Sequence, residues 1–230
     1  MSTFALVPGA WHGAWCLSSL AKELEALGHS AIAVELESNR ADATLAGLAE
    51  TVAAATPDAH EDVIVVGHSL SGVVIPLVAE LRPVAALVFL AAFVPRPGVS
   101  ISEEFELGGF RLAPGAGEGR ATDDQGRTYW SDRERAIELL YHDCERSEAE
   151  AAAARLRPQG QRAAREPNPL ARWPGVRSAY VPCTEDRMLD REFAGEMAAR
   201  LGVKPVAIEA GHSPFLSMPR ELAALLDSLF

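Results

Sequence analysis

The sequence has few cysteines and few positive charges, and each shortage argues against a class of protein. Its three cysteines, Cys16, Cys144 and Cys183, lie far apart and show no C-x-x-C spacing, so neither a disulfide framework nor a zinc site is indicated. Lysine and arginine total 21 against 32 aspartates and glutamates, and the net charge of -11 opposes binding to a phosphate backbone. We therefore expect free thiols, no metal and no nucleic-acid partner.

Long apolar runs are also missing. No run is long enough to span a bilayer, and residues 1–4 do not begin the basic and apolar regions of a signal peptide. We therefore expect a cytoplasmic protein with no membrane partner. The sequence leaves the oligomeric state open, a homodimer included.

The chain does contain an alternation of strand and helix patterns. Apolar or β-branched runs without polar alternation, as buried parallel strands require, occur at residues 4–7, 30–36, 62–66, 85–93, 178–183 and 203–209. Segments with helical periodicity separate them, and 230 residues is a common length for a single α/β domain. We predict an α/β fold with an open, doubly wound, mostly parallel sheet of six strands.

Residues 95–177 break this alternation. They contain glycine-rich turns, several aromatic residues and an Ala/Glu/Arg-rich helical segment near residues 148–156. We interpret them as a small cap inserted after the fourth strand, which leaves residues 1–94 and 178–230 as the core. The alternatives are a second small domain or a mobile loop, although so long a loop without regular structure is unusual.

The segment G-H-S-L-S-G at residues 67–72 lies between a predicted buried strand and a helix, the context of a serine nucleophile elbow. The pattern G-x-S-x-G would place glycine where this chain has Ser71. If Ser71 were the nucleophile, the β-branched Val73 would occupy a crowded flanking position, so we predict Ser69 as the nucleophile. We interpret Ser71 as a small residue that the turn tolerates. The alternative is a hydroxyl that binds substrate or supports the oxyanion loop.

A serine nucleophile needs a base within hydrogen-bond reach, and His212 is the best placed of the six histidines. It follows the last predicted strand and precedes a helix that begins at Pro214. This position is at the carboxyl edge of the sheet, where open α/β folds keep their sites and where Ser69 also lies. His29 and His60 precede strands at the opposite edge. We therefore predict His212 as the base.

Two further groups complete the predicted site. The base needs a carboxylate to orient it, and the fifth predicted strand ends at Glu185 and Asp186, both candidates. The oxyanion needs two backbone N–H groups, one after the nucleophile and one in the loop after the first strand. We assign these to Leu70 and to Ala10, because Gly9 lets the backbone before Ala10 fold closely.

Four motifs resemble the plant methylesterase and hydroxynitrile lyase branch of the α/β-hydrolase superfamily. They are P-G-A-W-H-G-A-W-C at residues 8–16, similar to H-G-x-x-H-G-x-W; G-H-S-L-S-G at 67–72, similar to G-H-S-x-G-G; C-T-E-D at 183–186; and G-H at 211–212. The resemblance implies an α/β-hydrolase fold with a six-stranded sheet, a small cap and no cofactor. It also implies Ser69, Asp186 and His212 as a triad, with Ala10 and Leu70 as oxyanion donors.

The chain departs from that branch at three positions. Pro8 replaces the first histidine and removes a backbone N–H near the oxyanion loop, and Ser71 replaces a glycine. The lyases carry a lysine directly after the catalytic histidine, where this chain has Ser213. The third departure removes the cation that a lyase of this type would use.

These observations predict a serine hydrolase that cleaves a small or medium apolar ester or lactone through an acyl-enzyme. We expect Trp11, Trp130 and Phe215 to contact this small-molecule substrate. One alternative is a lyase or cyclase that uses His212 as a general base without an acyl-enzyme. The second is a non-catalytic protein that binds a ligand in the same pocket.

Overall fold

The computed structural model describes residues 1–56, 62–190 and 192–230, so His60 lies outside the described residues. The strands are β1 (Thr3–Val7), β2 (Ser30–Ala33), β3 (Val63–His68), β4 (Ala86–Leu90), β5 (Arg120–Thr122), β6 (Thr128–Trp130) and β7 (Arg177–Val181). Five of them form a parallel sheet in the order β2-β1-β3-β4-β7, while β5 and β6 form a separate antiparallel hairpin. The predicted α/β fold with a mostly parallel sheet is confirmed.

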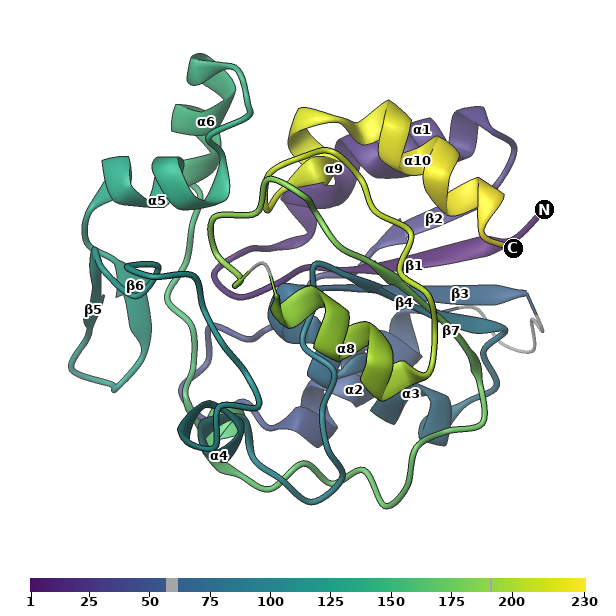
Figure 1. The fold of residues 1–230 in the computed structure, drawn as a ribbon, viewed down its shortest axis with the longest axis horizontal. Coiled ribbons are helices and arrows are strands. Elements are labelled where there is room, and N and C mark those ends of the chain that lie inside the picture. Colours follow the sequence, from purple (N-terminus) through teal and green to yellow (C-terminus); the bar gives the residue numbers. More distant parts are fainter. Residues whose placement is uncertain (57–61, 191) are drawn as a thin grey trace.

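Helices cover both faces of the sheet. They are α1 (Ser18–Ala26), α2 (Leu45–Ala55), α3 (Ile75–Leu81), α4 (Ile101–Glu106), α5 (Arg133–Leu140), α6 (Arg146–Ala153), α7 (Arg162–Arg165), α8 (Phe193–Leu201), α9 (Pro214–Ser217) and α10 (Pro219–Ser228), with 3₁₀ turns η1 (Ala14–Leu17) and η2 (Ser69–Val73). Figure 1 shows α1 and α10 on one face and α2, α3 and α8 on the other. This is the doubly wound arrangement.

The predicted sixth strand, residues 203–209, is reduced to an isolated parallel bridge between Cys183 and Ile208. The segment does run beside β7, because the Val206 N–H donates to the Tyr180 carbonyl and the Ile208 N–H to the Pro182 carbonyl, each at 3.0 Å. In a parallel ladder the N–H of residue 182 would donate the next hydrogen bond. Proline has no N–H, so Pro182 cannot form it. The described sheet therefore has five regular strands and not six.

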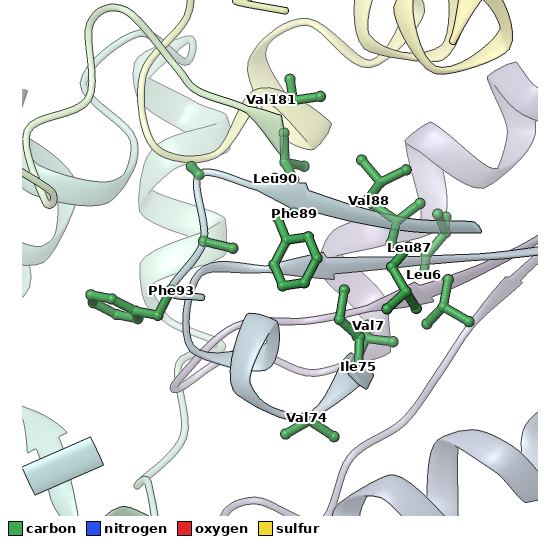
Figure 2. Packing of buried hydrophobic residues seen from close by; sticks show 14 of the residues in the cluster. Leu6, Val7, Val74, Ile75, Leu87, Val88, Phe89, Leu90, Phe93 and Val181 are labelled. Atoms are coloured by element: carbon green, nitrogen blue, oxygen red, sulfur yellow. The ribbon is translucent and has the colours of Figure 1, made fainter. Parts of the chain in front are cut away.

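The buried rows of β1, β3 and β4 form the centre of the core. Every residue of β3 and β4 is buried, and Figure 2 shows side chains of β1, β4 and the start of α3 packed together, among them Leu6, Phe89 and Ile75. Burying each such side chain stabilises the fold by about 1.5–3 kcal/mol. The carboxyl ends of β1 and β3, which precede the loops of the site, are therefore firmly held.

The chain between β4 and β7 contains α4, the β5–β6 hairpin, α5, α6 and α7. Figure 1 shows α5, α6 and the hairpin to one side of the sheet. A second buried cluster joins this part to the loop after β1, since it contains Ile137, Leu140 and Tyr141 together with Trp11. The assignment of residues 95–177 as a separate cap remains a prediction.

Candidate active site

Ser69 directly follows β3 and has a left-handed backbone, with φ of 51°. Such a conformation is strained for a residue with a Cβ and needs close packing around it to persist. A Cβ at Gly67 would lie 2.7 Å from Ile75 Cγ2, and one at Gly72 would lie 2.2 Å from the Phe93 carbonyl oxygen. The elbow therefore requires glycine at positions 67 and 72, and position 71 tolerates a Cβ.

The structure brings Ser69, His212 and Asp186 together. His212 Nε2 lies 3.1 Å from Ser69 Oγ, and His212 Nδ1 lies 2.8 Å from Asp186 Oδ2. Because the carboxylate accepts, Nδ1 carries the proton and Nε2 is left to accept the proton of the serine hydroxyl. The Glu185 side chain is exposed and does not join them.

Asp186 is itself held in place by backbone donors. Its Oδ1 accepts hydrogen bonds from the N–H groups of Met188 and Leu189, at 2.7 and 3.0 Å. Since Oδ1 is occupied in this way, Oδ2 faces His212. The loop after β7 therefore fixes the orientation of the carboxylate, and through it the tautomer of the histidine.

The two expected oxyanion donors, Ala10 and Leu70, both line the cavity that contains Ser69. Within the described part of the chain, neither backbone N–H donates a hydrogen bond. A Cβ at Gly9 would lie 2.6 Å from His68 Nδ1, so glycine is needed there for the loop to approach the elbow. Both amides are thus free to receive a developing negative charge.

A buried pair, His12 and Tyr141, supports the oxyanion loop. His12 Nδ1 donates to the Ala10 carbonyl at 2.8 Å, and the Tyr141 hydroxyl donates to His12 Nε2 at 2.7 Å. The pKa of His12 is lowered to about 4, mainly because the ring is buried; the hydrogen bond to Ala10 opposes this shift, and the charges of His212 and Arg157 add to it. A neutral His12 with its proton on Nδ1 satisfies both hydrogen bonds.

The Ser71 hydroxyl donates a hydrogen bond to the Pro8 carbonyl. Both residues are buried, and the bond ties the nucleophile elbow to the loop that carries Ala10. This contact agrees with the alternative interpretation, in which Ser71 supports the oxyanion loop, and disagrees with a residue that is merely tolerated. Sequence reasoning could not choose between these interpretations because the two residues are 63 positions apart.

Two residues for which the sequence predicted no role, His68 and Asp143, form hydrogen bonds that position the loop of His212. His68 Nε2 donates to the His212 carbonyl at 2.9 Å, and burial keeps the pKa of His68 well below its usual range. Asp143, in the turn between α5 and α6, accepts hydrogen bonds from the Gly211 N–H and the Ser217 hydroxyl, both at 2.7 Å. No sequence motif marks Asp143.

Ser69 opens into a cavity of about 190 Å³. Its wall is mostly apolar, with side chains from α2, α4, the turn before α3 and the loops after β4 and β7, including Leu48, Val74, Phe93, Ile101, Met188 and Leu189. Polar side chains line it as well, among them Ser38, Thr128, Gln159, Gln161 and Arg120. A volume of this size suits a small molecule, since one water occupies roughly 30 Å³ of liquid.

Only one of the three expected substrate contacts lines this cavity, and that residue is Trp11. Phe215 is fully buried and packs edge-on against His68, with ring centroids 4.8 Å apart, because α9 turns it toward the core. Trp130 packs edge-on against Trp11, with ring centroids 5.4 Å apart. Phe215 and Trp130 therefore do not line this cavity, and their role as substrate contacts stays a prediction.

Neither a metal site nor a membrane span is found in the described ranges. No group of three or more His, Cys, Asp or Glu side chains is arranged there to hold a metal ion. No helix among these residues is long and apolar enough to cross a membrane.

Comparison with known proteins finds relatives along nearly the whole chain. A sequence model of the alpha/beta hydrolase family matches residues 4–225. Polyneuridine aldehyde esterase of Rauvolfia serpentina is 28% identical over 254 residues, which cover 97% of this chain and 94% of that protein. Salicylic acid-binding protein 2 of Nicotiana tabacum is 30% identical over 256 residues, which cover 97% and 95%.

Solved structures show the same fold. A pyrethroid hydrolase from Sphingobium faniae JZ-2 superposes with a TM-score of 0.84 and 24% identity, over 99% of this chain and 96% of that one. At this identity the likeness concerns the fold. Its extent shows that the sheet, the helices and the segment between β4 and β7 all have counterparts.

Proposed function

The chain belongs to the alpha/beta hydrolase family and is an esterase, and we propose that it cleaves a small or medium carboxylic ester or lactone through an acyl-enzyme on Ser69. The observation that carries the proposal is the continuous hydrogen-bond chain from Ser69 Oγ through His212 to Asp186, with separations of 3.1 and 2.8 Å. Serine is a weak nucleophile alone, and this arrangement supplies its base.

In the proposed reaction, Ser69 Oγ attacks the ester carbonyl while His212 Nε2 takes the serine proton. The carbonyl oxygen becomes an oxyanion that the N–H groups of Ala10 and Leu70 stabilise. His212 then gives its proton to the departing alcohol oxygen as the carbon–oxygen bond breaks. A water then attacks the acyl-enzyme while His212 takes its proton. His212 returns this proton to Ser69 Oγ as the bond between the acyl carbon and Oγ breaks, which releases the acid and restores Ser69. Asp186 holds the imidazolium in each step.

The mostly apolar cavity wall supports a substrate whose acyl or alcohol part is apolar. Its size of about 190 Å³ favours short chains over long lipids. A screen of p-nitrophenyl esters of increasing acyl length, with methyl and aryl esters beside them, tests the proposal. We expect turnover of at least one short ester and a loss on the order of 10³-fold or more for Ser69→Ala. Failure to hydrolyse any ester would contradict the proposal.

The alternative of a lyase or cyclase needs only His212 as a base and no covalent intermediate. Ser213, which follows His212, is fully buried and neutral, so it supplies no positive charge for a leaving anion. Only a nucleophilic Ser69 forms a covalent adduct with a fluorophosphonate, and this reaction separates the two mechanisms. It also separates an enzyme from a protein that only binds a ligand in this cavity.

A further inference from the structure

Arg120, the first residue of β5, lines the same cavity as Ser69 and has no acidic partner. Its Nε donates to the Gly117 carbonyl at 3.2 Å, and its guanidinium carbon lies 5.3 Å from the centre of the Trp11 ring and 5.9 Å from that of Trp130. No carboxylate of the described residues lies within ion-pair distance of it. The two terminal nitrogens therefore keep their donors available to the cavity.

Arg120 lacks an ion pair although it lines a cavity, whereas eight other arginines of the described residues form one. Ion pairs are formed by Arg40, Arg96, Arg111, Arg127, Arg135, Arg146, Arg157 and Arg200. Acidic residues outnumber basic ones by 32 to 21, so carboxylates are plentiful in this chain. A half-buried cation without one is costly unless a ligand compensates it. Burial lowers the pKa of Arg120, and no neighbouring acid opposes that shift.

Other polar side chains of the cavity wall already form hydrogen bonds within the protein. Gln161 Nε2 donates to Thr128 Oγ1 at 3.2 Å, and Gln159 Oε1 accepts from the Trp11 N–H at 3.3 Å. These bonds fix the wall of the cavity around the guanidinium. Among the described residues that line the cavity, Arg120 is thus the cation, and its two terminal nitrogens donate no hydrogen bond to the protein.

We propose that Arg120 binds a carboxylate of the substrate, so that the preferred substrate is an ester or lactone with a carboxylate separated from the scissile bond by an apolar chain. A guanidinium matches the two oxygens of a carboxylate with parallel N–H donors. The apolar wall holds the connecting chain, and Ser69 attacks at the other end. This inference rests on the proposed esterase activity and specifies its substrate class.

The test uses matched pairs of esters that differ only in charge. One series is the monomethyl esters of four- to eight-carbon dicarboxylic acids, each paired with the methyl ester in which the carboxylate is replaced by a primary amide. A second series places the carboxylate on the alcohol side, as the acetate esters of ω-hydroxy acids and their amides. We expect wild-type protein to prefer the carboxylate member by roughly tenfold or more in kcat/KM at one chain length.

In Arg120→Met, the ratio of kcat/KM for the carboxylate ester to kcat/KM for its amide should fall to about one or below. Arg120→Lys should retain part of the preference. Arg155→Met is the matched control, because Arg155 also stacks over a tryptophan, Trp15, at 4.5 Å but does not line the cavity. The control should keep the wild-type preference. A wild-type protein without any preference for the carboxylate overturns the proposal. Equal losses on both members of a pair in Arg120→Met also overturn it, since Arg120 would then only support the β5–β6 hairpin.

A binding measurement keeps this inference distinct from the proposed reaction. Calorimetry on Ser69→Ala should show that the monomethyl ester of the best length binds at least tenfold more tightly than its amide. The double variant with Arg120→Met should lose the difference. If no ester is hydrolysed but the monomethyl ester still binds more tightly than its amide, the proposed reaction is wrong and the proposed carboxylate site is supported. If esters are hydrolysed and the difference is absent, the carboxylate site is wrong.

Discussion

The Ser71 hydroxyl donates its hydrogen bond to the Pro8 carbonyl, so the nucleophile elbow and the oxyanion loop are joined by one buried contact. Glycine at position 71 would lack this donor, and the Pro8 carbonyl would lose its partner. The position where this chain departs from G-x-S-x-G therefore has a structural role.

We predict that Ser71→Ala lowers kcat by roughly tenfold with little change in KM, because the looser oxyanion loop affects the transition state more than substrate binding. The unpaired Pro8 carbonyl should lower the free energy of unfolding by about 1–3 kcal/mol. Steady-state kinetics and urea unfolding measure these effects. Ser131→Ala, which removes a hydroxyl bond to the Gly119 carbonyl near the surface, is the control. A Ser71→Ala protein with wild-type kcat would restore the interpretation of a tolerated residue.

Asp143 provides a second prediction, since it anchors the loop that carries His212 through the Gly211 N–H. Asp143→Ala should lower kcat by roughly tenfold, whereas Asp143→Asn keeps an acceptor oxygen and should lose less. The exposed neighbour Glu145, changed to Gln, serves as the control. Kinetics of the three variants on one ester are sufficient. If Asp143→Ala raised KM and left kcat unchanged, the residue would act on substrate binding and not on the base.

A third prediction concerns pH and the buried His12. Its pKa of about 4 in the folded protein is below the usual 6.5, so between these values the unfolded chain binds a proton that the folded chain does not. The resulting stability is present above pH 6.5 and is lost as the pH falls toward 4. The free energy of unfolding should drop by up to about 1.4 kcal/mol for each pH unit in this window. His68 shifts in the same direction.

Urea unfolding of wild-type and His12→Gln protein at pH 7.5, 6.5, 5.5 and 4.5 measures this dependence. The variant is expected to be less stable at pH 7.5 but to lose less stability on acidification. Equal slopes in the two proteins would show that His12 does not titrate as its burial implies.

The choice between the two candidate acids gives a fourth prediction. Asp186→Asn should lower kcat more than Glu185→Gln, because only Asp186 contacts His212 and the Glu185 side chain is exposed. We expect Glu185→Gln to remain within a few-fold of wild type. The reverse ranking would move the orienting role to Glu185.

Much of the fold was predictable because its signals are local. The apolar run at residues 62–66 begins one residue before β3 and ends two residues before it does, and the neighbours of Ser69 mark the strand-to-helix turn. The sixth strand was overestimated because the interruption comes from Pro182 on the neighbouring strand, and not from the segment itself. A single run of sequence does not reveal which partner it will lie against.

The three residues of the proposed triad were predicted from chain order and from their common edge of the sheet, and the structure brings them within hydrogen-bond distance of one another. The hydrogen bonds that support these residues could not be predicted from chain order. Asp143 meets Gly211 across 68 positions and Ser71 meets Pro8 across 63, through packing between separate loops. The position of Phe215 was not predictable from the sequence either. It follows His212 by three residues, but it lies in α9 and is buried in the core.

Covalent labelling with a fluorophosphonate, followed by mass spectrometry of the intact protein and of its peptides, tests the central claim most directly. We predict one adduct per chain on the peptide that contains Ser69, loss of ester hydrolysis in proportion to labelling, and no adduct on Ser69→Ala. A wild-type protein that hydrolyses esters without being labelled at Ser69, or a Ser69→Ala protein that hydrolyses them at the wild-type rate, would contradict the proposed mechanism.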